Sequence, residues 1–152
     1  MADNVAPYNK SINFAEKLSK FNDHWSPKVI AEMNDYQFKL VKVLGDFVWH
    51  KHDDTDETFI ILDGSMRIDY RDHIVELSQG ELCVVKKGDE HKPFAEVECS
   101  ILLIEPKGVV NTGDATEDTK NLTAANDAWI WVGEMIVLKS SFFVPDSPET
   151  LI

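Results

Sequence analysis

Short apolar segments separated by turn residues dominate the middle of the sequence. Eight of them follow one another between Lys28 and Glu105, and no long helical pattern interrupts them. Many short strands at regular spacing are typical of an antiparallel sandwich or barrel. The sequence therefore predicts an all-β fold. The expected strands span residues 28–33, 36–44, 47–52, 57–63, 65–70, 73–78, 81–86 and 99–105.

Two turns in this region carry specific expectations. Asp63-Gly64 separates two apolar segments, and this dipeptide is a strong signal for a two-residue β-hairpin. Such a hairpin would join and pair residues 57–63 and 65–70. A further turn is expected around Val97, just before the last segment.

The two ends of the chain differ from the middle. Residues 11–21 carry apolar side chains at helical spacing, with Ser11 placed to cap a helix. The polar stretch after Pro106 leads to an apolar segment, Trp129–Leu138, which we expect to add a strand at a barrel edge or a subunit interface. We therefore expect an N-terminal helical arm (1–24), a β-barrel (25–106) and a C-terminal arm with an added strand (107–152).

The charge balance argues against nucleic acid as a partner. The chain has 27 acidic and 15 basic residues, and its net charge of −12 repels a phosphate backbone. No apolar run approaches the roughly 20 residues of a membrane-spanning helix. Residues 1–10 lack a targeting pattern, which makes the cytoplasm the expected location. Cys83 and Cys99 are expected to be reduced thiols in strands.

Two histidines two residues apart are the first candidates for chemistry. His50 and His52 lie in an expected strand, where alternate side chains share one face. Glu57 begins the next expected strand, and His91 follows a turn further along the chain. Three imidazoles and one carboxylate suit divalent Mn, Fe, Co, Ni, Cu or Zn. Four protein ligands on an octahedral ion leave two positions open, as in a reactive site.

The spacing of these residues resembles the two sequence motifs of the cupin family. The first motif corresponds here to Gly45, His50, His52, Glu57 and Gly64, with Gly45 one residue closer to His50 than is usual. The second corresponds to Gly80, Gly88 and His91, with Lys86 in place of the motif's proline and Ala95 in place of its asparagine. Small single-domain cupins described as mannose-6-phosphate isomerase-like are the most similar group.

The resemblance implies a fold and a metal site. The fold is a double-stranded β-helix, also called a cupin or jelly-roll barrel. The implied metal ligands are His50, His52, Glu57 and His91. Cupins commonly pair through their sheets, so a homodimer is expected as well. The alternative is a polar pocket that has lost its metal, as some family members have.

The residues around the site predict a largely apolar pocket. If Glu57 points inward, Phe59 and Ile61 do so too, and the hairpin would place Met66, Ile68 and Tyr70 beside them. Arg67 would face outward, which disfavours a phosphorylated sugar. Tyr70 is a weak candidate for a catalytic proton donor or acceptor. The alternative is a core tyrosine whose hydroxyl lies at the rim of the barrel.

Two functions remain open at this point. The first is an enzyme that uses Fe, Mn, Ni or Zn as Lewis acid and chelating template on a small organic molecule, in a dioxygenase-like or an isomerase- or lyase-like reaction. The second is a non-catalytic protein that binds a small ligand through its metal. An acid or base inside the barrel, other than the metal ligands, would favour the enzyme.

Overall fold

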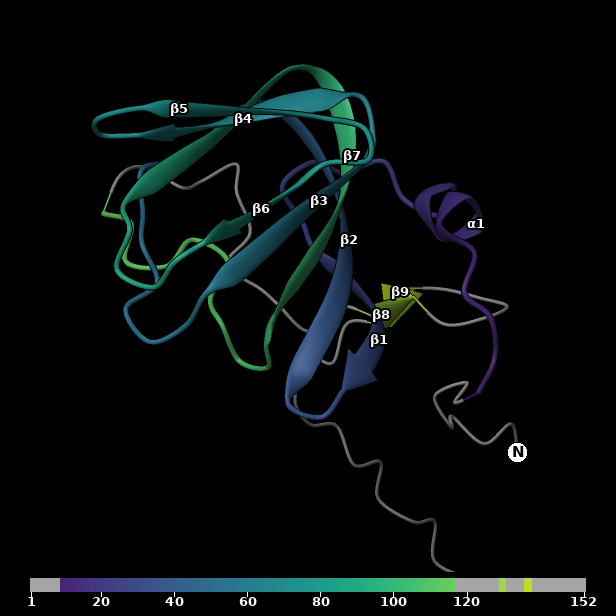
Figure 1. The fold of residues 1–152 in the computed structure, drawn as a ribbon. Coiled ribbons are helices and arrows are strands. Elements are labelled where there is room, and N and C mark those ends of the chain that lie inside the picture. The colour runs from purple at the N-terminus through teal and green to yellow at the C-terminus, as the bar shows by residue number, and fades with distance from the viewer. Residues whose placement is uncertain (1–8, 117–128, 131–135, 138–152) are drawn as a thin grey trace, which may run out of the picture.

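The computed structural model describes residues 9–116, 129–130 and 136–137, which form a β-barrel accompanied by a short helix (Figure 1). The predicted all-β fold is confirmed. In the described ranges no helix is long and apolar enough to cross a membrane. The elements are α1 (Phe14–Leu18), β1 (Lys28–Met33), β2 (Tyr36–Asp46), β3 (Glu57–Asp63), β4 (Ser65–Tyr70), β5 (Ile74–Ser78), β6 (Leu82–Val85), β7 (His91–Pro106), β8 (Trp129–Ile130) and β9 (Ile136–Val137).

The longest strand, β7, joins the two sides of the barrel. Its first part pairs with β4, and its last part pairs with β3, while β2 runs antiparallel along most of its length. The register between β2 and β7 shifts between Val43 and Gly45, opposite Ala95 and Cys99. At such a bulge a strand bends, and β7 arches over the barrel in Figure 1.

This arch corrects two expected boundaries. The strand predicted to begin at Cys99 begins at His91, and the turn expected at Val97 is an exposed position within the bulged part of β7. Residues 47–52, expected to form a strand, make only an isolated bridge. In that bridge the amide of His50 donates to the carbonyl of His91 (3.0 Å), and the amide of His91 donates to the carbonyl of His50 (2.9 Å).

The predicted hairpin at Asp63-Gly64 is wrong. β3 pairs with β6 and β7, whereas β4 pairs with β5 and β7, so the two strands that flank Gly64 do not pair with each other. The turn carries the chain from one side of the barrel to the other, and β7 occupies the edge that each strand would otherwise offer. Gly64 has a φ of +84°, and a Cβ there would lie 3.2 Å from the carbonyl oxygen of Glu98.

Side chains on the two faces of this sheet form two apolar clusters. Phe59 and Ile61 lie in the barrel interior, and the intervening Ile60 packs in a second cluster on the outer face. Met66 and Ile68 are buried in the interior cluster as predicted, although no β3–β4 hairpin places them there. The interior is therefore filled from both sides of the barrel.

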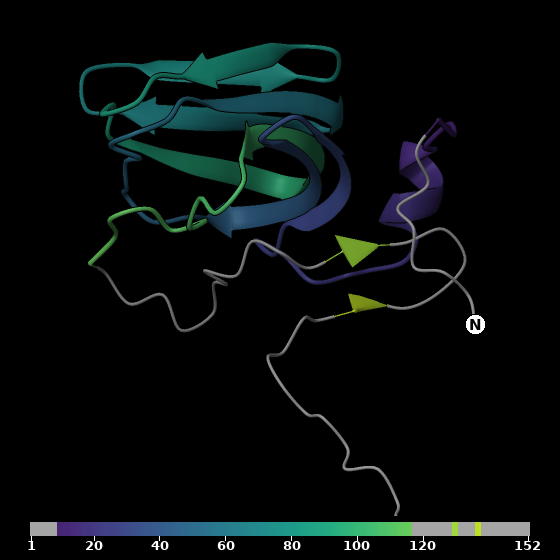
Figure 2. The same cartoon turned by 90° about the horizontal axis from the view of Figure 1, so that it is seen from below.

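The N-terminal helix covers part of the outer face. It is shorter than predicted, and Asn13 caps it instead of Ser11, because the Asn13 side chain accepts a hydrogen bond from the amide of Glu16 (2.9 Å). Phe21, just beyond the helix, is buried in the outer cluster. Figure 2 shows α1 and the β8–β9 pair beside the barrel.

The strand expected from the apolar C-terminal segment is present in part. β8 pairs in parallel with β1 at Val29 and Trp129, and β9 pairs with β8. The ammonium group of Lys17 donates to the carbonyl of Ile130 (3.1 Å), which ties α1 to this added edge. The rest of the predicted segment lies outside the described residues.

Gly64→Ala should destabilise the fold more than Gly80→Ala. Both glycines have positive φ (+84° and +86°), which costs an alanine about 1 kcal/mol or more. Only the methyl group of an alanine at position 64 would also press on backbone atoms, whereas nothing lies within 4 Å of a Cβ at Gly80. Urea unfolding should show a loss of about 2 kcal/mol for Gly64→Ala and about 1 for Gly80→Ala. Equal losses would contradict the close approach at Gly64.

Candidate metal centre

The four predicted ligands lie in the barrel interior on three segments of the chain. Glu57 is the first residue of β3 and His91 the first of β7, while His50 and His52 belong to the segment bridged to β7. Their exposed fractions range from 0% for His91 to 8% for His52. Three of them, His50, Glu57 and His91, offer ligand atoms that all lie within 4.8 Å of one another.

Backbone carbonyls fix the orientation of two imidazoles. Nδ1 of His50 lies 3.0 Å from the carbonyl oxygen of Val48, and Nδ1 of His91 lies 3.0 Å from that of Asp89. A carbonyl only accepts, so each Nδ1 carries the proton and each Nε2 keeps a lone pair. This second contact is the usual way in which proteins orient a metal-binding histidine.

His52 approaches the same oxygen of Glu57 as His91 does. Its Nε2 lies 3.5 Å from Oε2 of Glu57, while Nε2 of His91 lies 3.4 Å from the same oxygen. His52 is not part of the first triad but forms a second one with Glu57 and Glu105. The predicted set is thus divided into two overlapping triads that share Glu57.

Glu105 is the residue that sequence reasoning missed. It stands near the end of β7, and like Lys39 on β2 it has no exposed surface. Lys39 Nζ and Glu105 Oε1 lie 2.5 Å apart in a buried ion pair. The signal was present in the sequence, because Glu105 shares the inward parity of Ile101 and Leu103.

The buried donor atoms of the centre fit a metal ion. Among the described side chains, His52 Nε2, Glu57 Oε2, His91 Nε2 and Glu105 Oε2 are buried without a hydrogen-bond partner. Nε2 of His52 and Nε2 of His91 lie 3.5 Å and 3.4 Å from Oε2 of Glu57, at the limit of hydrogen-bond length. Each buried polar atom without a partner costs about 1–3 kcal/mol, and a cation among them would remove that cost.

The charge states of His50 and Glu57 also suit a cation. Burial, and then the neighbouring His91, lower the pKa of His50 to about 4, so His50 is neutral at pH 7. Burial alone would raise the pKa of Glu57, but His52 and His91 outweigh it and keep the pKa below its ordinary value. Burial, followed by the charge of Glu57, raises the pKa of Glu105 to about 7. Neutral imidazole and ionised carboxylate are the forms that bind metal.

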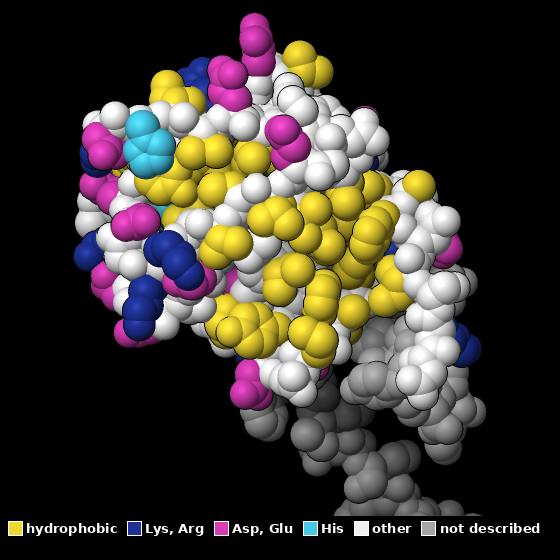
Figure 3. All heavy atoms as spheres, viewed as in Figure 1, with side chains coloured by type: hydrophobic (Ala, Val, Ile, Leu, Met, Phe, Trp, Pro, Cys, Tyr) yellow, Lys and Arg dark blue, Asp and Glu magenta, His cyan; other side chains and the backbone are white. Residues whose placement is uncertain are grey.

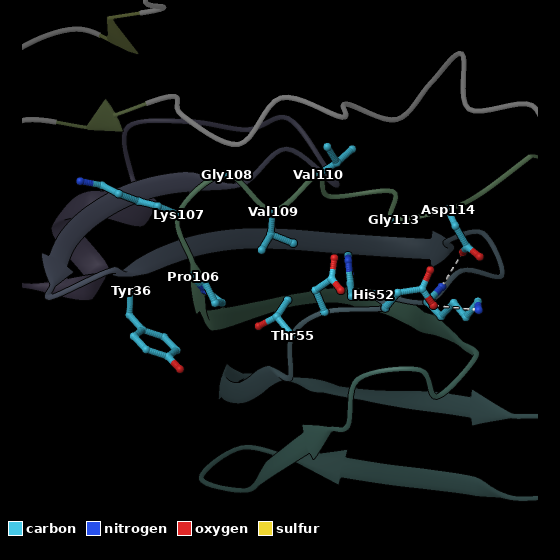
Figure 4. A pocket seen from close by; sticks show the side chains of 13 residues that line it. Tyr36, His52, Thr55, Pro106, Lys107, Gly108, Val109, Val110, Gly113 and Asp114 are labelled. Atoms are coloured by element: carbon cyan, nitrogen blue, oxygen red, sulfur yellow. Dashed lines mark hydrogen bonds and ion pairs between the residues drawn. The ribbon is translucent and has the colours of Figure 1, made fainter.

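A cavity of about 650 Å³ opens beside this centre, and we call it the mouth cavity. Its walls come from residues 51–55, 106–110 and 113–114, together with Tyr36, and His52 is the predicted ligand that lines it (Figure 4). By contrast, the space beside His50, Glu57 and Phe59 is only about 20 Å³, enough for roughly one water molecule. The accessible pocket is therefore the polar mouth, and the apolar residues predicted to line it form solid core.

Tyr70, the weak catalytic candidate, is half-buried away from the mouth cavity walls. Its hydroxyl lies 3.8 Å from Sγ of Cys83, and its ring stacks on His73 at a centroid distance of 4.5 Å. Burial raises the pKa of its hydroxyl, so the hydroxyl stays protonated at pH 7. Its role remains a prediction.

In the metal-free protein, His50 should lower the stability of wild type relative to His50→Gln as the pH falls from about 6.5 to about 4. In that range His50 takes up a proton in the unfolded chain but not in the folded one, because its folded-state pKa is lowered to about 4. The contribution is about 3 kcal/mol. In urea unfolding with a chelator present, the unfolding free energy of wild type minus that of His50→Gln should fall by about this amount over the range, whereas wild type and His73→Gln should run parallel. Parallel curves for wild type and His50→Gln would contradict the expectation.

Comparison with known proteins identifies the family. The Cupin domain family matches residues 40–105, a range that includes all four predicted ligands and Glu105. A cupin-2 domain containing protein from Shewanella frigidimarina is 61% identical, covering 63% of this chain and 94% of its own, with a TM-score of 0.63. Protein NMB1881 from Neisseria meningitidis is 34% identical over 64% of this chain and 100% of its own, with a TM-score of 0.60. The uncharacterized protein YdbB of Bacillus subtilis is 34% identical over 79 residues, 51% of this chain and 70% of that protein. The chain belongs to the cupin family.

Proposed function

We propose that this cupin binds a divalent transition metal through His50, His52, Glu57 and His91 and acts on a small organic molecule. The observation that carries the proposal is the group of buried donor atoms without partners, on a side of the barrel that the mouth cavity reaches. A metal bound there supplies a Lewis acid and a template for a chelating pair of oxygens. Fe, Mn, Ni and Zn all suit this donor set.

The mouth cavity indicates which molecules fit. Its basic side chains are already paired, Lys51 with Asp53 (2.8 Å) and Lys107 with Glu32 (2.8 Å). Asp114 adds another carboxylate to the wall. A phosphorylated sugar would find no cation fixed for its phosphate. The charges of the cavity favour a neutral or cationic molecule with oxygen donors, and they argue against carrying over the mannose-6-phosphate isomerase-like assignment.

The open cavity supports an enzyme over a binding protein without turnover. Structural metal sites are closed by protein ligands, whereas catalytic sites keep a side that water or substrate can reach. His52 lines the mouth cavity, so this side of the centre is accessible. With Fe the proposed reaction class is a dioxygenase, and with Mn, Ni or Zn an isomerase or lyase. Oxygen uptake with enolic and catecholic compounds separates the two classes, and ligand binding without turnover would identify a binding protein.

Elemental analysis tests the metal site directly. Protein purified without metal-affinity steps should contain about one transition-metal ion per chain. His91→Ala and Glu57→Gln should reduce this content at least tenfold, because each removes a buried donor. His73→Ala is the matched control, since His73 is exposed and outside both triads. Metal content that is low in wild type and unchanged in the variants would disprove the proposed site.

The outer sheet face supports the expected homodimer. Apolar side chains gather over β2, β3, β6 and β7 on the face seen in Figure 3. We call this patch the outer apolar face and define it by Phe38, Ile60, Leu82, Val84 and Ile104. Leu82 is 59% exposed and Val84 is 43% exposed. An apolar face of this kind on a soluble chain commonly marks an interface, and a second copy would cover it by sheet packing.

Analytical ultracentrifugation should show a dimer at tens of micromolar. Val84→Lys should shift the protein to monomer, because it places a charge on the outer apolar face. Ile74→Lys should leave the dimer intact, since Ile74 is equally exposed (58%) but lies on β5, outside the outer apolar face. A wild-type monomer, or equal effects of the two changes, would contradict this interface.

A further inference from the structure

The buried carboxylate of Glu105 has one oxygen in use and one without a partner. Lys39 holds Oε1, and Oε2 has no hydrogen-bond partner in the part of the chain that the structure describes. Both residues have no exposed surface. Burying a charged pair is costly, and leaving one carboxylate oxygen unsatisfied adds to the cost. The four ligands predicted from the sequence do not account for this residue.

Oε2 of Glu105 belongs to a group of neighbouring buried atoms that lack hydrogen-bond partners among the described residues. His52, Glu57 and Glu105 each offer a ligand atom within 4.8 Å of the other two. Nε2 of His52 and Oε2 of Glu57 also lack hydrogen-bond partners among the described residues. The two carboxylates repel each other at this distance, and the charge of Glu57 contributes, after burial, to the raised pKa of Glu105. A cation between them would turn that repulsion into attraction.

We propose that Glu105 is a fifth metal-binding residue of the centre, completing an oxygen-rich triad with His52 and Glu57. The inference rests on the proposed metal function and extends it to ion selectivity. The first triad, His50–Glu57–His91, presents two nitrogens and one oxygen, and the second presents one nitrogen and two oxygens. Imidazole suits Zn²⁺, whereas carboxylate suits Mn²⁺. Glu105 therefore favours oxygen-preferring ions.

The charges of the interior set the number of ions at one. With Glu105 ionised as a metal ligand, Lys39 balances its charge, so Glu57 supplies one net negative charge. A single divalent ion leaves one positive charge, which an anionic oxygen of a bound molecule can balance. Two ions would leave three uncompensated positive charges in a buried site, at a high cost in free energy. The triads are thus overlapping positions for one ion.

The oxygen-rich triad lies on the accessible side of the centre. His52 lines the mouth cavity, and so does Pro106, which follows Glu105 in the chain (Figure 4). The nitrogen-rich triad faces the small apolar space instead, where His50 and Glu57 are among the lining residues. A molecule that enters through the mouth cavity therefore meets the ion from the side of His52.

Titration of metal-free protein with Mn²⁺ and with Zn²⁺ tests the proposal. Glu105→Gln should weaken Mn²⁺ binding about tenfold or more, because it removes a carboxylate donor. Zn²⁺ affinity should change about threefold or less, since its nitrogen donors remain. His91→Asn should show the opposite preference. Glu76→Gln, on the exposed face of β5, is the matched control and should change neither affinity.

A second variant covers the case in which Glu105→Gln fails to fold with Lys39 left unpaired. Lys39→Met combined with Glu105→Leu removes the whole buried pair, and apolar replacements of such pairs are often tolerated. It should show the same selective loss of Mn²⁺ affinity. Unchanged Mn²⁺ affinity, parallel losses for both ions, or binding of two ions per chain would overturn the proposal. Wild type that binds neither ion would instead overturn the metal function itself.

Discussion

Antiparallel pairing of β7 with three strands is the constraint on which the barrel and its site depend. Because β7 bends at the bulge opposite Gly45, its first residue, His91, and its last-but-one residue, Glu105, both approach Glu57. A straight strand would hold these two residues far apart, at about 3.3 Å of rise per residue. The register of β7 thus determines which donor atoms meet.

The polar centre of the barrel is stabilised through Glu57. This carboxylate is the member common to both triads, and its charge lies against His52 on one side and His91 on the other. Apolar side chains fill the interior on the side of Phe59 and leave room for roughly one water molecule. A ligand therefore has access from the mouth cavity, and the chemistry of that mouth is polar and acidic.

Prediction from the sequence succeeded where local patterns were sufficient. Alternation along residues 57–61 placed Glu57, Phe59 and Ile61 on the inward face, as the structure confirms. Prediction failed where the structure of a turn is decided by pairing between distant strands. Asp63-Gly64 has the composition of a hairpin turn, but β7 pairs with both flanking strands and the turn becomes a crossing between the sides of the barrel. The sequence cannot show which distant segment competes for a strand edge.

The sequence by itself determined the strand-rich fold and four candidate ligands, because strand periodicity is a local property of the chain and the spacing of His50, His52, Glu57 and His91 matches the cupin motifs. Only the tertiary structure decided that the ligands fall into two triads and that Glu105 joins one of them. The physical reason is that the bulge in β7 between Ala95 and Cys99 sets where both ends of the strand lie. The positions of the two ends of β7 depend on pairing across the whole barrel, and no short stretch of sequence encodes them.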